Sequence, residues 1–403
     1  MGKIKKKLGI LSSILLVLVL VSAVMLSIPA LAWTDYPLQP TDAEVAGALD
    51  YLRGEQFDDG NIGGFGPSAW VTMAIAAAGE DPHDWRVGNN PSIVDYLAAN
   101  ANEAASAADY ARMILAIVAT DEDPANFGGV DFVNLLKGQY NNNQIGDDSL
   151  LNDDFWGVIA LISAGESPSS EIAANSVAFI KNHQNATDHG WSWGVGQDSD
   201  VDSTASAIMA LIAAGESPSS SVITNGLAYI KSTQMDNGGF ESWGATNPST
   251  DSWAIDAIVA AGQDPTGDAW TKNGNTPDDD LLSFQNADGS FPDWQGNPSP
   301  WVTSYAIPAL LGKPYPVKIL QAWSFWAIEY PAALLRVYPG DTVVNLDTVT
   351  GVPTEILGIF AETEGVWSWF IPTWTPAGNT LHELVPGRPY IVQISGACTW
   401  VIT

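Results

Sequence analysis

Cysteine and basic residues are scarce in this chain of 403 residues, and both shortages restrict what it can be. The single cysteine, Cys398, lies close to the C-terminus, so no intramolecular disulfide can form and the core alone must stabilise the fold. Only 15 Lys and Arg stand against 46 Asp and Glu, which gives a formal net charge of -31. A surface of that sign repels phosphate backbones and anionic lipid headgroups, so we expect no nucleic-acid partner.

Histidine is also rare, and this argues against a metal centre. The four histidines are His83, His183, His189 and His382. None stands at ligand spacing with cysteine or with another histidine, so we interpret them as surface residues. Acidic pairs such as Asp58-Asp59 and Asp153-Asp154 do not fit a calcium-binding loop with its distant glutamate. We therefore predict no metal site and no cofactor.

Long apolar runs are missing except at the N-terminus. Residues 1–7 carry four lysines, residues 8–26 are almost wholly apolar, and Ala30-Leu31-Ala32 supplies small residues for a signal peptidase. This order predicts a signal peptide over residues 1–32, followed by a linker over 33–41, in a secreted or cell-surface protein. An uncleaved membrane anchor is the alternative, because the apolar run is long. Under either interpretation, only this segment contacts the membrane.

The chain does contain a sequence repeat, which occurs about six times between residues 42 and 315. A helix-like run ends in a glutamine, a turn rich in Gly, Asn and Asp follows, and a second, more apolar helix ends in Ala-Gly. The glutamines are Gln56, Gln139, Gln184, Gln234 and Gln285, and a weaker copy without this signature runs from Ile93 to Pro124. Glycine and asparagine supply the positive φ of tight turns, and glycine followed by proline is typical of a helix end.

The two helices of each unit differ in polarity. Second helices such as VTMAIAAAG and ASAIMALIAAG are apolar nearly all round, which favours an inner layer, whereas first helices such as GLAYIKSTQ carry polar residues and suit an outer layer. The units resemble the prenyltransferase and squalene-cyclase repeat, which implies a terpenoid cyclase-like (α/α)6 toroid. This resemblance is specific for fold and leaves activity open. The cysteine that the family's zinc-dependent protein prenyltransferases would need, and the motif of its thioester proteins, are missing from the toroid.

One short motif in the repeats resembles a catalytic one. Asp200-Val201-Asp202-Ser203 is similar to the DxDD motif of class II terpene cyclases, which implies Asp202 as general acid, assisted by Asp200. Ser203 replaces the last aspartate of that motif. The other copies of the repeat have Ser68, Asp154, Asp251 and Ser299 at the position of Asp202, and all of these are favoured N-cap residues. Helix capping is therefore the competing interpretation of Asp202.

Tryptophan is unusually abundant, with 17 residues, and four of them recur two residues after these predicted caps. They are Trp70, Trp156, Trp253 and Trp301. At the mouth of a toroid they could stack on a cobalamin-like, glycan or lipid ligand, or pack between repeats and close the ring. Further aromatics lie in the turns, where we expect packing between repeat ends: Phe65, Trp191, Trp193, Phe240, Trp243, Phe291 and Trp294.

The pattern changes near residue 316, where short β-branched and aromatic runs alternate with turn signals. We predict a small all-β, sandwich-like domain over 316–403, similar to modules appended to secreted surface proteins, with a cell-surface or cell-wall component as a candidate partner. The sequence thus predicts a mainly α protein that binds a small or apolar ligand in an aromatic toroid cavity without catalysis. The alternative is a class II terpene cyclase that uses Asp202.

Overall fold

The computed structural model describes residues 36–317 with their side chains and, beyond them, the backbone of six short strands. The predicted signal peptide and residues 33–35 of the predicted linker lie outside these residues, as does Cys398. Within the described residues, no helix is long and apolar enough to cross a membrane.

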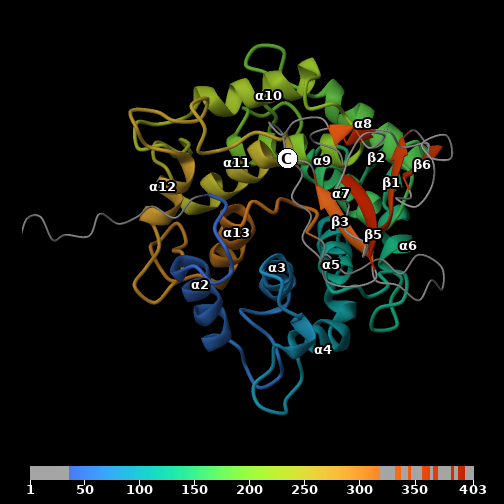
Figure 1. Ribbon diagram of the computed structural model, residues 1–403, viewed down its shortest axis with the longest axis vertical. Helices are drawn as coiled ribbons and strands as arrows, with labels where there is room; N and C mark the ends of the chain where they lie inside the picture. Colours follow the sequence, from blue (N-terminus) through green and yellow to red (C-terminus); the bar gives the residue numbers. More distant parts are fainter. Residues whose placement is uncertain are drawn as a thin grey trace, which may run out of the picture. The chain divides into compact units, whose positions relative to one another are not determined.

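Residues 36–317 alternate between outer and inner helices (Figure 1). The outer helices are α2 (Ala43–Gly54), α4 (Ile93–Ala99), α6 (Phe132–Lys137), α8 (Glu171–Asn182), α10 (Ser221–Ser232) and α12 (Pro277–Ser283). The inner helices are α3 (Phe65–Ala77), α5 (Ala107–Ala119), α7 (Asn152–Ser163), α9 (Val201–Ala213), α11 (Pro248–Ala260) and α13 (Pro300–Leu310). Two 3₁₀ turns, η1 (Pro82–Asp84) and η2 (Ala101–Glu103), and a hairpin of β1 (Tyr140–Asn141) with β2 (Gln144–Ile145) lie in the connections.

The inner helices form a closed ring. Each contacts the next along the chain, and α13 returns to contact α3, while the outer helices pack against the inner layer. Inner helices are buried on nearly every side, as the run from Ser68 to Ala77 in α3 shows. The predicted toroid of six helix pairs is therefore confirmed, including the weak copy, which forms α4 and α5.

Helix ends follow the sequence signals. The glycines after five inner helices, Gly79, Gly165, Gly215, Gly262 and Gly312, all have positive φ between 60° and 92°. This left-handed conformation suits glycine and stops each helix. The Glu that follows Gly at two ends pairs with a lysine in the last turn of the outer helix before it, as in Lys137 with Glu166 and Lys181 with Glu216.

The repeated glutamines connect neighbouring repeats. The Gln234 side-chain amide donates to Gly238 O in its own turn, at 2.7 Å, and to Trp270 O in the next repeat. Gln56 and Gln184 bond in the same way. Gln285 closes the ring, because its amide donates to Gly289 O at 3.0 Å and to Glu44 O of the first repeat at 2.7 Å. Gln139 is exposed, and the hairpin β1–β2 forms its turn instead.

We expect Gln285→Ala to lower the free energy of unfolding by roughly 1–3 kcal/mol, because it leaves two backbone carbonyls without their donor. Urea unfolding followed by tryptophan fluorescence measures this. Gln295→Ala, in an exposed turn position, is the matched control and should change little. Equal stability of the two variants would show that the seam does not depend on this side chain.

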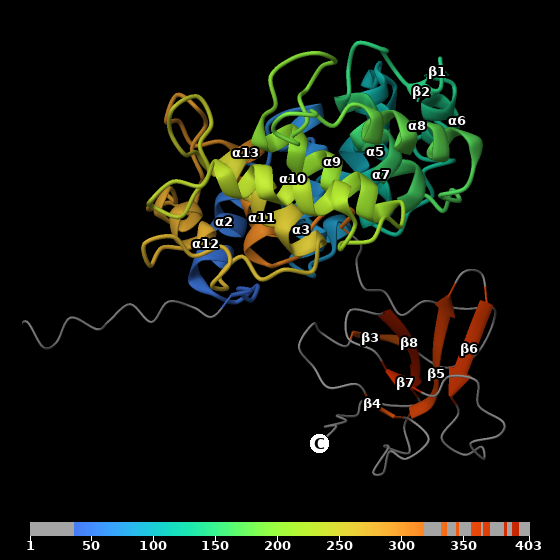
Figure 2. The same ribbon diagram turned by 90° about the horizontal axis from the view of Figure 1, so that it is seen from above.

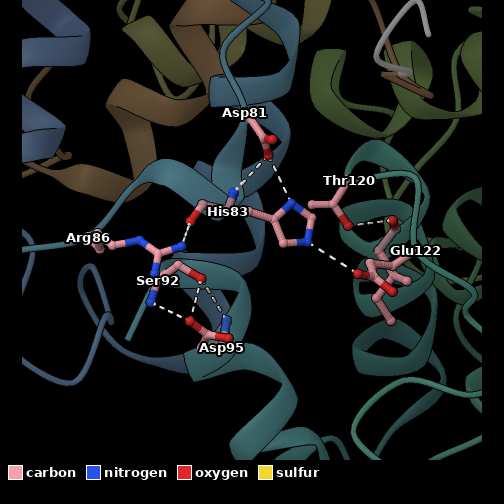
Figure 3. Close-up of polar contacts among 8 residues, drawn as sticks. Asp81, His83, Arg86, Ser92, Asp95, Thr120 and Glu122 are labelled. Atoms are coloured by element: carbon pink, nitrogen blue, oxygen red, sulfur yellow. Dashed lines mark hydrogen bonds and ion pairs between the residues drawn. The ribbon is translucent and has the colours of Figure 1, made fainter. Parts of the chain in front are cut away.

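His83 links η1 to the end of α5 (Figure 3). Its Nδ1 lies 2.8 Å from Asp81 Oδ1 and its Nε2 lies 3.2 Å from Glu122 Oε1. Partial burial disfavours the charged ring, but the hydrogen bonds and charges of these two carboxylates outweigh it and raise the pKa of His83. The predicted surface histidine is thus a partly exposed contact between two repeats.

A raised histidine pKa makes the contact pH-dependent. Its stabilisation is fully present below the unfolded pKa of about 6.5 and is lost as pH rises through the higher folded pKa. We expect the melting temperature of the natural chain to exceed that of His83→Gln at pH 6 and to approach it above pH 8. His189→Asn, at a half-buried position in the turn after α8 where the ring has no carboxylate partner, is the control and should show no such trend; an equal trend in both variants would contradict the assignment.

The C-terminal strands form two antiparallel groups. β3 (Ala332–Arg336), β8 (Pro389–Ile394), β5 (Ile356–Thr363) and β6 (Val366–Phe370) lie side by side in that order (Figure 2). The second group pairs β4 (Val344–Asn345) with β7 (Glu383–Leu384). Strands therefore occur where the β-rich pattern predicts them, while the sandwich-like domain over 316–403 stays a prediction.

Candidate functional site

A cavity of about 270 Å³ opens among the inner helices. It is lined by Trp70, Ala108, Arg112, Asn152, Trp156, Trp193, Asp202, Ser203, Ser206, Trp253, Trp301 and Tyr305. All four predicted tryptophans and Asp202 are therefore brought together. Arg112, Asn152, Ser206 and Tyr305 belong to the same wall and were missed by the sequence prediction.

The helix periodicity explains this set. Counted back from the helix ends, the same position on five inner helices holds Trp70, Arg112, Trp156, Ser206 and Trp253, and Tyr305 takes the corresponding place on α13, which ends two residues sooner. The position one turn earlier holds Ala108, Asn152, Asp202 and Trp301 on four of those helices. Residues four apart lie on one helix face, so the two positions form two levels of the cavity wall.

In five of the six inner helices, all but α5, a buried hydrogen bond sets which residues face the cavity. The position that holds Trp70 and its equivalents forms the lower level of the cavity. Two residues before it in the sequence, a side-chain oxygen accepts a hydrogen bond from the backbone N–H of the apolar residue at the end of the preceding turn. The pairs are Ser68 with Ile62, Asp154 with Ile145, Thr204 with Trp191, Asp251 with Phe240, and Thr303 with Phe291, at 2.8 to 2.9 Å. This bond defines the equivalent residues of the repeats.

The predicted capping alignment is therefore wrong for four of its five residues. Asp200, and not Asp202, is the N-cap of α9, since its carboxylate accepts the Ser203 N–H at 2.7 Å and the Ser203 hydroxyl at 2.8 Å. Ser68, Asp154 and Asp251 lie inside their helices, and only Ser299 is an N-cap. Thr204, and not Asp202, is the residue of α9 that is equivalent to Asp154, and Thr303, not Ser299, is the equivalent residue of α13.

Asp202 is thus a cavity residue that the repeat does not explain. Burial, with a smaller contribution from the charge of Asp200, raises the pKa of its carboxyl to about 6, against the hydrogen bond from Thr250. Its Oδ1 is buried and has no hydrogen-bond partner. Burial also raises the pKa of Asp200, but both of its oxygens already accept bonds from Ser203.

The lower level is dominated by packed aromatic rings. Trp70 stands at its centre, with ring centroids 5.2 Å from Trp156, 5.6 Å from Trp253 and 5.2 Å from Tyr305, mostly edge to face. Tyr315, which follows α13, packs against Trp70 at 5.3 Å. These rings are nearly buried by one another. They form a rigid aromatic floor, while Trp301 is 38% exposed at the upper level and donates to the Tyr305 hydroxyl.

Two further wall atoms are buried without a partner. Trp70 Nε1 and Arg112 Nε make no hydrogen bond, although another nitrogen of Arg112 pairs with Asp109. Together with Asp202 Oδ1, the side chains that line the cavity thus carry two unpaired donors and one unpaired acceptor, each of them buried. Unpaired buried polar atoms are costly, and a bound molecule that pairs with them would remove the cost. No group of three or more metal-ligating side chains gathers anywhere in the described residues.

No protein-family model and no curated protein matches this chain. Among solved structures, it is similar to a variant of the type II terpene cyclase MstE from Scytonema, at 10% identity and a TM-score of 0.48 over 67% of this chain and 96% of the cyclase. An alpha-amylase from Clostridium perfringens matches at 14% identity and a TM-score of 0.48, over 68% of this chain and 99% of that one.

The ent-copalyl diphosphate synthase from Streptomyces platensis matches at 15% identity and a TM-score of 0.46, over 62% of this chain. This chain spans half the length of that synthase. Terpene cyclases and an amylase thus both resemble the chain in fold, and the likeness carries no choice of activity. The closed ring of helices in the structure itself supports the predicted terpenoid cyclase-like toroid.

The raised pKa of Asp202 predicts how its replacement affects stability. The folded chain binds the proton more tightly than the unfolded chain, so this contribution is present below about pH 4 and is lost as pH rises through about 6. We expect Asp202→Asn to be more stable than the natural chain at pH 8 and equal to it at pH 4. Urea unfolding at both pH values measures this, with exposed Asp198→Asn as control. A gain that is the same at both values would contradict it.

Proposed function

We propose that the cavity binds one sugar-sized, uncharged polar ligand, with a glycan end as the favoured class. The observation that carries this proposal is the set of unpaired atoms in the wall, Asp202 Oδ1, Arg112 Nε and Trp70 Nε1, beside exposed aromatic surface. A sugar ring offers hydroxyls that donate and accept on its edge and C–H groups on its face. Such a ring would pair with the polar atoms and stack on Trp301 at once.

Cavity size supports the same class. Pockets for drug-sized ligands measure roughly 300–1,000 Å³, and this one measures about 270 Å³. A polyprene of 20 or 30 carbons exceeds it, whereas a single six-membered ring does not. A corrin ring would also exceed it. We therefore favour the glycan among the three predicted ligand classes.

Acid catalysis by Asp202 is the second candidate, in the manner predicted for a class II terpene cyclase. The observation that favours it is a carboxyl with a pKa of about 6 and an unpaired oxygen in a cavity with an aromatic floor. Raised carboxyl pKa values are a common property of general acids. Asp200 would act there by positioning α9 through Ser203.

The two candidates predict opposite pH dependence. For binding, we expect sugar affinity to rise as pH increases through about 6, because the ionised Asp202 carboxylate is the stronger acceptor. For catalysis, we expect turnover to fall over the same range, because the acid loses its proton. Tryptophan fluorescence titration with neutral mono- and oligosaccharides measures the first, and product analysis with squalene or geranylgeranyl diphosphate measures the second.

Variants sharpen the comparison. Asp202→Asn should weaken sugar binding roughly tenfold and remove its pH dependence, and Asp198→Asn should change neither. A cyclised product that disappears in Asp202→Asn would instead establish the catalytic candidate. No response to any sugar over pH 5–8 would reject the binding proposal.

Export and a cell-surface location follow from the N-terminal segment and remain part of the proposal. A secreted glycan-binding toroid next to a β module would meet its ligand outside the cell. N-terminal sequencing of the protein from its source tests this, with Trp33 as the expected first residue if the signal peptide is cleaved after Ala32.

A further inference from the structure

Three consecutive turns from outer to inner helices carry an exposed tryptophan. Trp193 lies between α8 and α9, Trp243 between α10 and α11, and Trp294 between α12 and α13. Their exposed fractions are 50%, 102% and 89%. The expectation that these three pack between repeat ends is wrong, although Trp191, Phe240 and Phe291 two or three residues earlier are fully buried as expected.

The position of these turns connects them to the cavity. Every turn from an outer to an inner helix lies where the inner helix begins, and the upper level of the cavity comes from the first turn of those helices. Trp193 itself lines the cavity, and so does Trp301, at the start of α13 just after the Trp294 turn. The three turns follow one another round the ring and thus border one side of the cavity mouth.

The backbone at Trp243 is unusual for a large residue. Its φ is 57°, in the left-handed region where glycine is favoured, and its side chain is fully exposed. A bulky side chain held there is a genuine outlier and packs against nothing that would stabilise it. The turn therefore keeps a tryptophan where folding alone favours glycine, which points to a surface contact.

Charge selects the kind of partner. The segments 183–200, 233–247 and 284–299 contain seven acidic residues and no Lys or Arg. They are Asp188, Asp198, Asp200, Asp236, Glu241, Asp288 and Asp293. Lys231 and Lys272 contact these segments, but both donate hydrogen bonds to Gln234, and Lys272 also pairs with Asp236. The acidic excess would therefore repel an anionic polymer or an anionic membrane. A neutral, hydroxyl-rich partner would stack on the rings and donate to the carboxylates.

We infer that these tryptophans extend the cavity into a track for a neutral polysaccharide, with one chain end or branch in the cavity and following sugar units on Trp193, Trp243 and Trp294. This inference rests on the proposed function, since the cavity supplies one subsite. It adds that the natural ligand is a polymer and names the surface that holds it.

The test is affinity electrophoresis of the purified full-length chain in native gels that contain soluble neutral glucans, mannan, galactan or xylan. We expect at least one polymer to retard the protein. A double variant, Trp243→Gly with Trp294→Ala, should weaken that retardation roughly tenfold, while leaving the affinity for a mono- or disaccharide of the same sugar unchanged. Phe57→Ala is the matched control, because Phe57 is 61% exposed in the turn of the first repeat.

The outcomes separate this inference from the proposed function. Retardation that survives the double variant, or no retardation by any polymer while short sugars still bind, would overturn the track alone. Retardation that needs the two tryptophans but is unaffected by Asp202→Asn would uphold the track and reject the cavity as its subsite. Binding of the natural chain, but not of the double variant, to phosphatidylcholine vesicles in place of glycans would assign these tryptophans to a membrane and overturn the inference.

Discussion

One buried hydrogen bond, present in five of the six repeats, controls how the inner helices face the centre of the ring. A side-chain oxygen near the start of the helix accepts the N–H of the residue that closes the preceding turn, as Thr204 does for Trp191. The bond satisfies a donor that is sealed from water and fixes the rotation of the helix about its axis. Because that rotation is fixed, the residue two positions later always points into the cavity, whichever residue it is.

The group that supplies this oxygen, and with it the free-energy cost of burial, differs from repeat to repeat. Ser68 and Thr204 supply a neutral hydroxyl, whereas Asp154 and Asp251 bring a carboxyl into the same buried place. Burial raises the pKa of Asp154 to about 7, and burial together with nearby Asp280 raises the pKa of Asp251 well above its usual range. A protonated carboxyl group can accept the hydrogen bond from the N–H of the turn without burying a negative charge. These positions therefore tolerate aspartate because the raised pKa favours its neutral form.

The sequence predicted the ring well because its signals are local and repeated. Glycine at the helix ends, glutamine at the turns and apolar inner helices are each decided by a few neighbouring residues. The second repeat was recognised only weakly, since it lacks the glutamine signature, and Arg112 was missed with it. The glutamine pattern predicted helix pairs but not the closure of the ring. There, Gln285 of the last repeat donates a hydrogen bond to Glu44 O of the first repeat, at the other end of the toroid sequence.

The candidate site was predicted in part, and the error has a physical reason. Ser, Thr and Asp serve equally as helix caps and as acceptors inside the first turns, so residue type alone could not separate Asp200, Asp202 and Thr204. Only the bond from Trp191 N–H identifies Thr204 as the repeated position and leaves Asp202 one turn above Ser206. The tryptophans were found because their side chains are large and recur, but their mutual packing into a floor depends on the closure of the ring.

The proposed binding function depends on where the symmetry of the ring is broken. A ring of six identical repeats would present the same residue six times, and the floor approaches this with Trp70, Trp156, Trp253 and Tyr305. The upper level does not, because α7 and α9 contribute Asn152 and Asp202 while α13 contributes Trp301. Helix α13 stands three places round the ring from α7, so Trp301 and Asn152 come from opposite sides, while Trp193 adds an aromatic ring on the side that carries the polar residues. A ligand with a polar edge and an apolar face would be oriented by that opposition, and such orientation is what a fixed helix rotation makes possible.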